Sequence, residues 1–279
     1  MKIRKALTIV LLAVLALLSS CTKTVAEPES SPDTDSTPFF SSRGSGGHFR
    51  DRKNPHSSSL SPEASSEIEH IGKELEDIPD AGQSVTDYSE LTRGYSYSQR
   101  GRTYFINPFA GILIDLTGWT QMDLSELADS FDIDPEALRE WSDEDFKTNF
   151  VTPDLYAYMF DAKNLRSVMI MSFFENISLD NVAGRNRKEY LLFQMEQLAS
   201  EDEDYGFSAP FTVTLSGKEF IGISCTYSME GFEFTQYTLV RQYGDYMYNI
   251  SIMGTNLGDI QDIYDLFIEI PDSPSPGLN

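Results

Sequence analysis

Apolar and polar positions divide the 279-residue chain into four successive parts. A short apolar run stands near the N-terminus, a long segment almost without apolar clusters follows, and apolar density is then high as far as Ile270. Long polar segments do not bury enough apolar surface to fold, whereas dense apolar patterning is typical of a folded domain. The pattern predicts an N-terminal segment, a tether, a folded domain and a flexible tail over residues 1–20, 21–99, 100–271 and 272–279.

The periodicity of the third part predicts an α+β domain. Apolar runs and period-two alternation indicate strands, and two hairpin turns are expected at Gly244-Asp245 and at 229–231. Capping residues Asp123 and Asp134 each precede an expected helix start, the second with Pro135 at the first helical position. The expected strands are 111–116, 155–161, 167–175, 211–216, 219–228, 232–243 and 246–253, and longer helices are expected over 179–199 and 259–268. Consecutive hairpins favour one antiparallel sheet of about six to eight strands flanked by helices, as in an α/β/α sandwich.

The N-terminal run has the features of a bacterial secretion signal. Lys2, Arg4 and Lys5 precede thirteen residues that are apolar except for Thr8, which is too short a run to span a bilayer. The run closes on Leu18-Ser19-Ser20-Cys21, which resembles the bacterial lipobox. This resemblance implies cleavage before Cys21, a diacylglycerol and palmitate-type anchor on its thiol, and a domain on the extracytoplasmic side of the cell membrane. The alternative is an ordinary secretory signal with an incidental cysteine.

The second part is expected to be a disordered Ser/Pro/acidic tether. One exception is the segment 63–76, where Ile68, Ile71 and Leu75 stand at helical spacing. A transient helix is the favoured interpretation, and docking on the domain or on a partner is the alternative. A small basic group, Arg50, Arg52 and Lys53, provides three charges that could contact anionic lipid.

Charge and residue usage exclude several kinds of function. The net charge is −23, and phosphate backbones repel such a chain, so nucleic acid is not expected as a partner. If Cys21 carries lipid, Cys225 has no cysteine to pair with. Residues 98–279 contain no histidine, the commonest general base and metal ligand.

Several phrases of the domain resemble the PsbP-like family. Phe109, the run 111–116 and Gly118-Trp119 match the opening strand pair of that family, with Thr117 where proline is usual. A later match runs from Gly217-Lys218-Glu219-Phe220 to 241–246. The resemblance implies an antiparallel sheet between helices, a fold shared with a nuclear-import factor that binds Ran. It also implies a mostly non-enzymatic role in binding or assembly.

Acidic and cysteine-bearing motifs in the domain have structural explanations. The stretch 132–136 is similar to a calcium loop, but Ala137 and Asp143 stand where an EF-hand needs glycine and glutamate, so helix capping by Asp134 is favoured. A weak divalent-ion site at Asp143-Glu144-Asp145 is the lesser alternative to a solvated loop. Cys225 alternates with apolar residues and is expected to be a buried small hydrophobe rather than a nucleophile.

Two surface features are candidates for binding. Tyr237, Tyr243, Tyr246 and Tyr248 could form the floor of a groove for sugars or peptides, although core positions are the favoured interpretation. Arg185, Arg187 and Lys188 could receive an acidic partner, although a charged outer helix face is the default.

These observations favour a membrane-anchored, non-catalytic module that binds a partner protein or a small ligand, with no metal or cofactor. The alternative is a hydrolase built on paired carboxylates that acts on cell-wall or host glycans. A passive surface-coat protein is a third interpretation. The sequence assigns no catalytic residue, and Cys21 is the one site residue that it predicts.

Overall fold

The computed structural model describes residues 61–78, 93–131, 133–142, 151–161, 166–178, 185–199, 205–229 and 232–270, together with Asp145 and Asn149. Its helices are α2 (Pro62–Asp77), α3 (Leu124–Ser130), α4 (Pro135–Glu140), α6 (Arg187–Ala199) and α7 (Gln261–Tyr264). Its strands are β1 (Tyr95–Gln99), β2 (Arg102–Asn107), β3 (Ile112–Asp115), β4 (Thr120–Gln121), β5 (Val151–Asp161), β6 (Arg166–Asn176), β7 (Gly206–Phe207), β8 (Phe211–Leu215), β9 (Lys218–Met229), β10 (Phe232–Tyr243) and β11 (Tyr246–Thr255). Cys21 and the basic group 50–53 lie outside the described residues.

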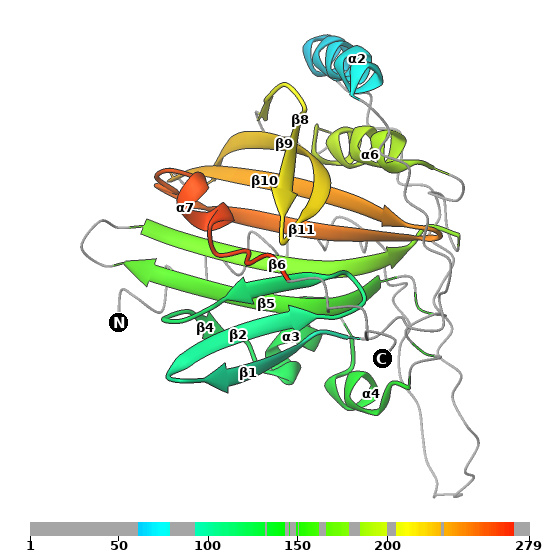
Figure 1. Ribbon diagram of the computed structural model, residues 1–279. Helices are drawn as coiled ribbons and strands as arrows, with labels where there is room; N and C mark the ends of the chain where they lie inside the picture. The colour runs from blue at the N-terminus through cyan, green and yellow to red at the C-terminus, as the bar shows by residue number, and fades with distance from the viewer. Residues whose placement is uncertain are drawn as a thin grey trace, which may run out of the picture.

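The strands form two antiparallel sheets, which confirms the predicted α+β class. The large sheet has the order β4-β5-β6-β11-β10-β9-β7, with β8 also paired to β9, and the small sheet has the order β1-β2-β3. In Figure 1, α6 lies at one end of the large sheet and α2 lies beyond α6. The small sheet and α7 both lie in front of the large sheet. The second face of the large sheet is therefore covered mainly by strands, where the sequence predicted helices.

Burial is nearly continuous along the central strands β6 and β11, because each has apolar residues on both faces. One hydrophobic cluster joins β2, β3 and α7 to the large sheet, and includes Phe105, Ile114, Ile250 and Ile263. On the opposite face, Tyr190 and Met195 of α6 pack over Ile221 and Val240. The central part of the sheet is thus buried on both sides.

The hairpins and helix caps confirm the turn chemistry predicted from the sequence. Tyr243 pairs with Tyr246 across Gly244, whose φ is +58°. Phe232 pairs with Met229 across the second expected turn. Asp134 accepts a hydrogen bond from the Glu136 N–H and so caps α4, with Pro135 at its start.

The segment expected to form a transient helix is a docked helix instead. In α2 the side chains of Ile68, Ile71 and Leu75 are almost fully buried, and they belong to the same cluster as Tyr190 and Leu191 of α6. Since β1 also begins at Tyr95, ordered structure starts well before residue 100. The docking alternative is therefore correct for 62–77, and the rest of the tether prediction stands untested.

Two predicted helices differ in length from the observed ones. The helix predicted over 179–199 begins at Arg187, because Asn186 caps it by accepting hydrogen bonds from the N–H groups of Lys188 and Glu189. The helix predicted over 259–268 contains one turn, α7. It ends because the following backbone pairs with β3: the Asp115 N–H donates to Leu266 O, and the Ile268 N–H donates to Leu113 O.

Candidate binding surface

The β1–β2 hairpin is built by a tight two-residue turn. Arg100 and Gly101 have φ values of +53° and +78°, so both turn residues are left-handed, as a type I′ turn requires. Gln99 pairs with Arg102 beside the turn, and Tyr97 pairs with Tyr104 further along. The twist of this turn matches the twist of the strands, and it fixes which side chains share a face.

Three tyrosines lie on the outward face of this hairpin. Alternation places Tyr95, Tyr97 and Tyr104 on the side away from the large sheet, whereas Phe105 points inward and is buried. The ring centroids are 6.4 Å apart for Tyr95 and Tyr97, and 5.4 Å apart for Tyr97 and Tyr104. Tyr95 is 57% exposed. We call the surface formed by Tyr95, Tyr97, Arg102, Tyr104 and Asp115 the tyrosine face.

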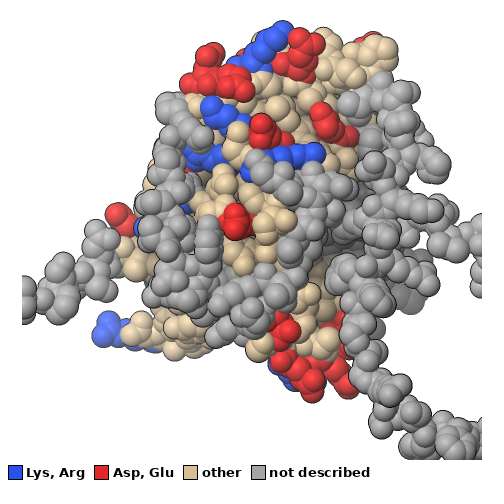
Figure 2. Space-filling view, turned by 90° about the vertical axis from the view of Figure 1, so that its right-hand side faces the viewer, with Lys and Arg blue, Asp and Glu red and all other residues tan. Residues whose placement is uncertain are grey.

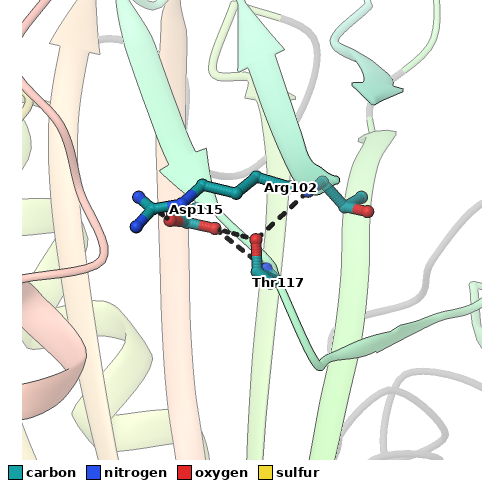
Figure 3. Close-up of polar contacts among 4 residues, drawn as sticks. Arg102, Asp115 and Thr117 are labelled. Carbon is teal, nitrogen blue, oxygen red and sulfur yellow. Dashed lines mark hydrogen bonds and ion pairs between the residues drawn. The ribbon is translucent and has the colours of Figure 1, made fainter. Parts of the chain in front are cut away.

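A polar group borders the rings at the end of β3 (Figure 3). Arg102 donates to Asp115 Oδ2 at 3.3 Å, and the Thr117 hydroxyl and N–H donate to Asp115 Oδ1 at 2.5 and 3.0 Å. Thr117 Oγ1 in turn accepts from the Thr103 N–H at 3.1 Å. The Arg102 side chain is 61% exposed, so the ion pair contributes less than about 1 kcal/mol to stability. Its main effect is to hold a cation at a defined place beside the rings.

A buried carboxylate fixes the start of β1 against the large sheet. Asp154, beside a register shift in β5, accepts hydrogen bonds from the Gly94 N–H at 2.6 Å, from Asn107 Nδ2 at 3.0 Å and from the Tyr248 hydroxyl at 2.8 Å. Burial raises the pKa of Asp154 above its ordinary value, although these hydrogen bonds and the Arg93 guanidinium oppose the shift. The tyrosine face is therefore positioned by a buried polar network that joins both sheets.

Two hollows in the described part of the chain lie away from the tyrosine face. One of about 160 Å³ is lined by residues of the β10–β11 hairpin and of the segment before α6, including Arg185 and Asp245. It is smaller than the pockets of about 300–1,000 Å³ that hold small ligands. The other, about 550 Å³, lies along the outer side of α2 beside Glu63 and His70.

The tyrosines singled out in the sequence belong to the core. Tyr243, Tyr246 and Tyr248 are buried and Tyr237 packs against the same cluster, so they form no groove. Cys225 is also buried, which raises the pKa of its thiol to about 12. Both favoured interpretations are confirmed.

The basic cluster is not an outer helix face. Arg187 is almost fully buried and lies 3.6 Å from Glu219 Oε1, Arg185 lies over the Phe193 ring at 4.0 Å, and the Lys188 ammonium donates to Glu76 O. The default expectation is therefore wrong for Arg187, because α2 and the sheet enclose this end of α6. Figure 2, which views this end of the molecule, shows basic side chains in a band with acidic ones above and below.

The acidic motifs do not converge on a metal or on a catalytic pair in the described part of the chain. Asp134 caps α4, Asp145 accepts from Ser142, and Asp132, Asp143 and Glu144 lie outside the described residues. Within the described ranges there is no group of three or more His, Cys, Asp and Glu side chains that could hold a metal ion.

Two buried carboxylates, Asp154 and Glu175, lie on opposite faces of the large sheet. Ser172 of β6 points toward Asp154, with its Oγ 3.4 Å from Asp154 Oδ2, and Glu175 stands three positions later on the same strand. An odd spacing places side chains on opposite faces, and Glu175 accepts from Tyr190 of α6 on the helix side. These two carboxylates therefore do not share one cleft.

Sequence reasoning missed the tyrosine face. Tyr95-Ser96-Tyr97-Ser98 alternates with period two before an Arg100-Gly101 turn, so the hairpin signal was present. The segment reads as tether from composition alone, because the strand lacks aliphatic residues. The Arg102–Asp115 pair joins different strands and has no local signal.

Comparisons with known proteins identify no family. No protein-family model matches the chain, and no curated protein matches it. Solved structures that resemble it include a putative regulator of unknown function from Pseudomonas aeruginosa, with 9% identity, a TM-score of 0.30, and coverage of 61% of this chain and 88% of that one. Another is LpqN of Mycobacterium tuberculosis, described as involved in cell envelope biogenesis, with 13% identity, a TM-score of 0.29, and coverage of 54% of this chain and 75% of that one.

Within the described ranges, no helix has both the length and the apolar character that crossing a lipid bilayer requires.

Proposed function

We propose that this chain is a lipid-anchored, extracytoplasmic and non-catalytic protein whose α+β domain binds a partner protein through the tyrosine face. The observation that carries the proposal is the row formed by the exposed Tyr95 and the half-buried Tyr97 and Tyr104, beside the guanidinium of Arg102. Tyrosine and arginine are the residues that most often dominate binding energy at protein interfaces. The lipobox ending in Cys21 supports the anchor, and the pairing of β2 with β3, which covers 112–115 of the run 111–116, supports the PsbP-like resemblance.

The shape of the surface favours a protein over a small ligand. Small-molecule sites are concave, whereas none of the residues of the tyrosine face lines either of the hollows described above. The rings are held by a hairpin that is tied to the core through Gly94 and Asp154, so little side-chain and backbone entropy is lost on binding.

The binding proposal is tested by crosslinking on intact cells, followed by mass spectrometry. The double variant Tyr95→Ala/Tyr104→Ala removes two rings without altering the core. A loss of about 2 kcal/mol per anchoring residue corresponds to roughly thirtyfold weaker binding for each. Phe232→Ala is the matched control, since Phe232 is 54% exposed and lies outside the tyrosine face.

We expect a protein that is crosslinked to the wild type and to Phe232→Ala and is depleted at least tenfold with the double variant. An identical set of crosslinked proteins for all three chains would refute the tyrosine face as the binding surface. The anchor is tested separately with Cys21→Ala, which should move the chain from the membrane fraction to the soluble fraction.

A further inference from the structure

Strand β1 lies at the edge of the small sheet, and one side of its backbone has no strand partner among the described residues. In a hairpin closed by a two-residue turn, the residues next to the turn exchange hydrogen bonds, and bonded and non-bonded pairs then alternate. Gln99, Tyr97 and Tyr95 therefore bond to β2, whereas Ser96 and Ser98 direct their N–H and C=O groups to the other side. No described strand pairs with that side of β1.

This edge lacks the features that prevent strands from pairing with other chains. Natural edge strands are protected by charged residues, proline, bulges or a covering element. The sequence Tyr-Ser-Tyr-Ser-Gln has no charge and no proline, its pairing with β2 is regular, and Ser96, Ser98 and Gln99 are exposed. In a chain of net charge −23, a five-residue strand without charges is a place where two copies can meet without like charges opposite each other.

We propose that two copies of this chain pair through antiparallel β1 strands, with Tyr97 opposite Tyr97 of the second copy. In that register Ser96 faces Ser98 of the other copy, so the four outward N–H and C=O groups on each strand are all satisfied. Both small sheets join into one six-stranded sheet related by a two-fold axis, the commonest symmetry of homo-oligomers. The inference goes beyond the proposed function, and it does not require that a partner protein exists.

The paired sheet makes the tyrosine face continuous between the two copies. Tyr97 stacks on Tyr104 within each copy, and the proposed register brings the two Tyr97 side chains together. The row then runs Tyr104, Tyr97, Tyr97 and Tyr104 across four neighbouring strands. Aromatic cross-strand pairs stabilise the register in which they face each other, so the tyrosines favour this register over its neighbours.

The pairing is expected to be weak in dilute solution. A single five-residue strand pair buries far less than the roughly 1,200–2,000 Å² of a standard interface. The net charge of each copy also opposes association, so added salt should strengthen the dimer. Anchoring both copies to one membrane raises their effective concentration and compensates for a small interface.

The register is tested by cysteine crosslinking of the purified full-length protein. Residues in a non-bonded antiparallel pair have Cα atoms about 4.5 Å apart, within the range of a disulfide. Tyr97→Cys should therefore give a disulfide-linked dimer under mild oxidation, and more of it at higher salt. In Gln99→Cys the two cysteines would lie about 13 Å apart along the strand, beyond the reach of a disulfide.

Matched variants at Ser98 distinguish strand pairing from random collision. In the Tyr97→Cys background, Ser98→Pro removes an outward N–H without touching the β1–β2 hydrogen bonds, whereas Ser98→Ala keeps that N–H. We expect at least tenfold less dimer with Ser98→Pro and an unchanged yield with Ser98→Ala. Equal crosslinking of Tyr97→Cys and Gln99→Cys, or no dimer above the wild-type background with Tyr97→Cys, would overturn the proposal even if Ser98→Pro failed to fold.

Discussion

Removing the carboxylate of Asp154 should destabilise the domain and release the start of β1. In Asp154→Ala the Gly94 N–H and the Asn107 amide lose their acceptor, whereas the Tyr248 hydroxyl keeps Ser172 at 3.0 Å. Each buried donor left without a partner costs about 1–3 kcal/mol. Relief of a desolvated charge offsets part of this cost, so we expect a net loss of about 2–4 kcal/mol. That loss is a large fraction of the free energy of unfolding of a typical domain, which is about 5–15 kcal/mol.

The measurement is urea unfolding at pH 7, with Asp115→Asn as the control because Asp115 is partly exposed and its ion pair is with the exposed Arg102. Asp115→Asn should change the free energy of unfolding by less than about 1 kcal/mol. A loss below 1 kcal/mol for Asp154→Ala would show that the network does not stabilise the fold, and would refute the reasoning.

The pH dependence of the same site has a defined sign. Because the folded pKa of Asp154 is raised above 3.8, the folded state binds the proton more tightly than the unfolded chain does. The contribution of Asp154 to stability is then complete below pH 3.8 and is lost as the pH rises through the folded pKa. Each tenfold difference in proton affinity corresponds to about 1.4 kcal/mol.

Asp154→Asn isolates this titration, because asparagine is close in shape and does not ionise. The free energy of unfolding of the wild type should fall relative to that of Asp154→Asn between pH 3.5 and pH 7. A relative rise over that interval would mean that the hydrogen bonds and Arg93 outweigh burial, and that the pKa is lowered.

Two further outcomes test the helix α2 and Cys225. Ile71→Asp places a charge among the buried residues of α2, so tryptic cleavage at Lys73 should accelerate while the unfolding midpoint of the domain stays within about 3 °C. Glu69→Ala, on the exposed side, should change neither the cleavage rate nor the midpoint. If Ile71→Asp unfolded the whole domain together with α2, α2 would not be a part of the structure that opens independently. Because the Cys225 thiol has a pKa of about 12, peptide mass spectrometry should find it unlabelled by thiol reagents at pH 8 in the folded protein and labelled in urea, and rapid labelling of the folded chain would contradict its burial.

The antiparallel sheet could be predicted because its signals are local. Alternation in β11 and the Gly244-Asp245 turn specify both a strand and its neighbour without information from elsewhere. The length of α7 could not be predicted in this way, because the helix ends where its backbone pairs with β3, about 150 positions earlier in the sequence. Tertiary pairing there outweighs the helical spacing of Ile260, Ile263, Tyr264 and Phe267.

The docking of α2 shows a second limit. Ile68, Ile71 and Leu75 give the correct helical period, but three apolar residues in a polar segment do not reveal whether a receiving surface exists. That surface is formed by Tyr190 and Leu191 of α6, about 120 positions later. The helix was therefore predictable, and its burial was not.

The position of the tyrosine face depends on the Asp154 network, and this explains why composition alone places β1 in the tether rather than in the folded domain. Strand β1 has no aliphatic residue that could anchor it in the core, so its position depends on polar contacts: Gly94 on Asp154, and Ser96 on Gln121 of β4. A strand held by polar contacts can keep its apolar rings outside, where an aliphatic strand would bury them. The same polar composition that is typical of a tether is therefore what leaves Tyr95 exposed and Tyr97 partly exposed, and any change that loosens Asp154 should weaken the proposed binding at a surface that Asp154 does not touch.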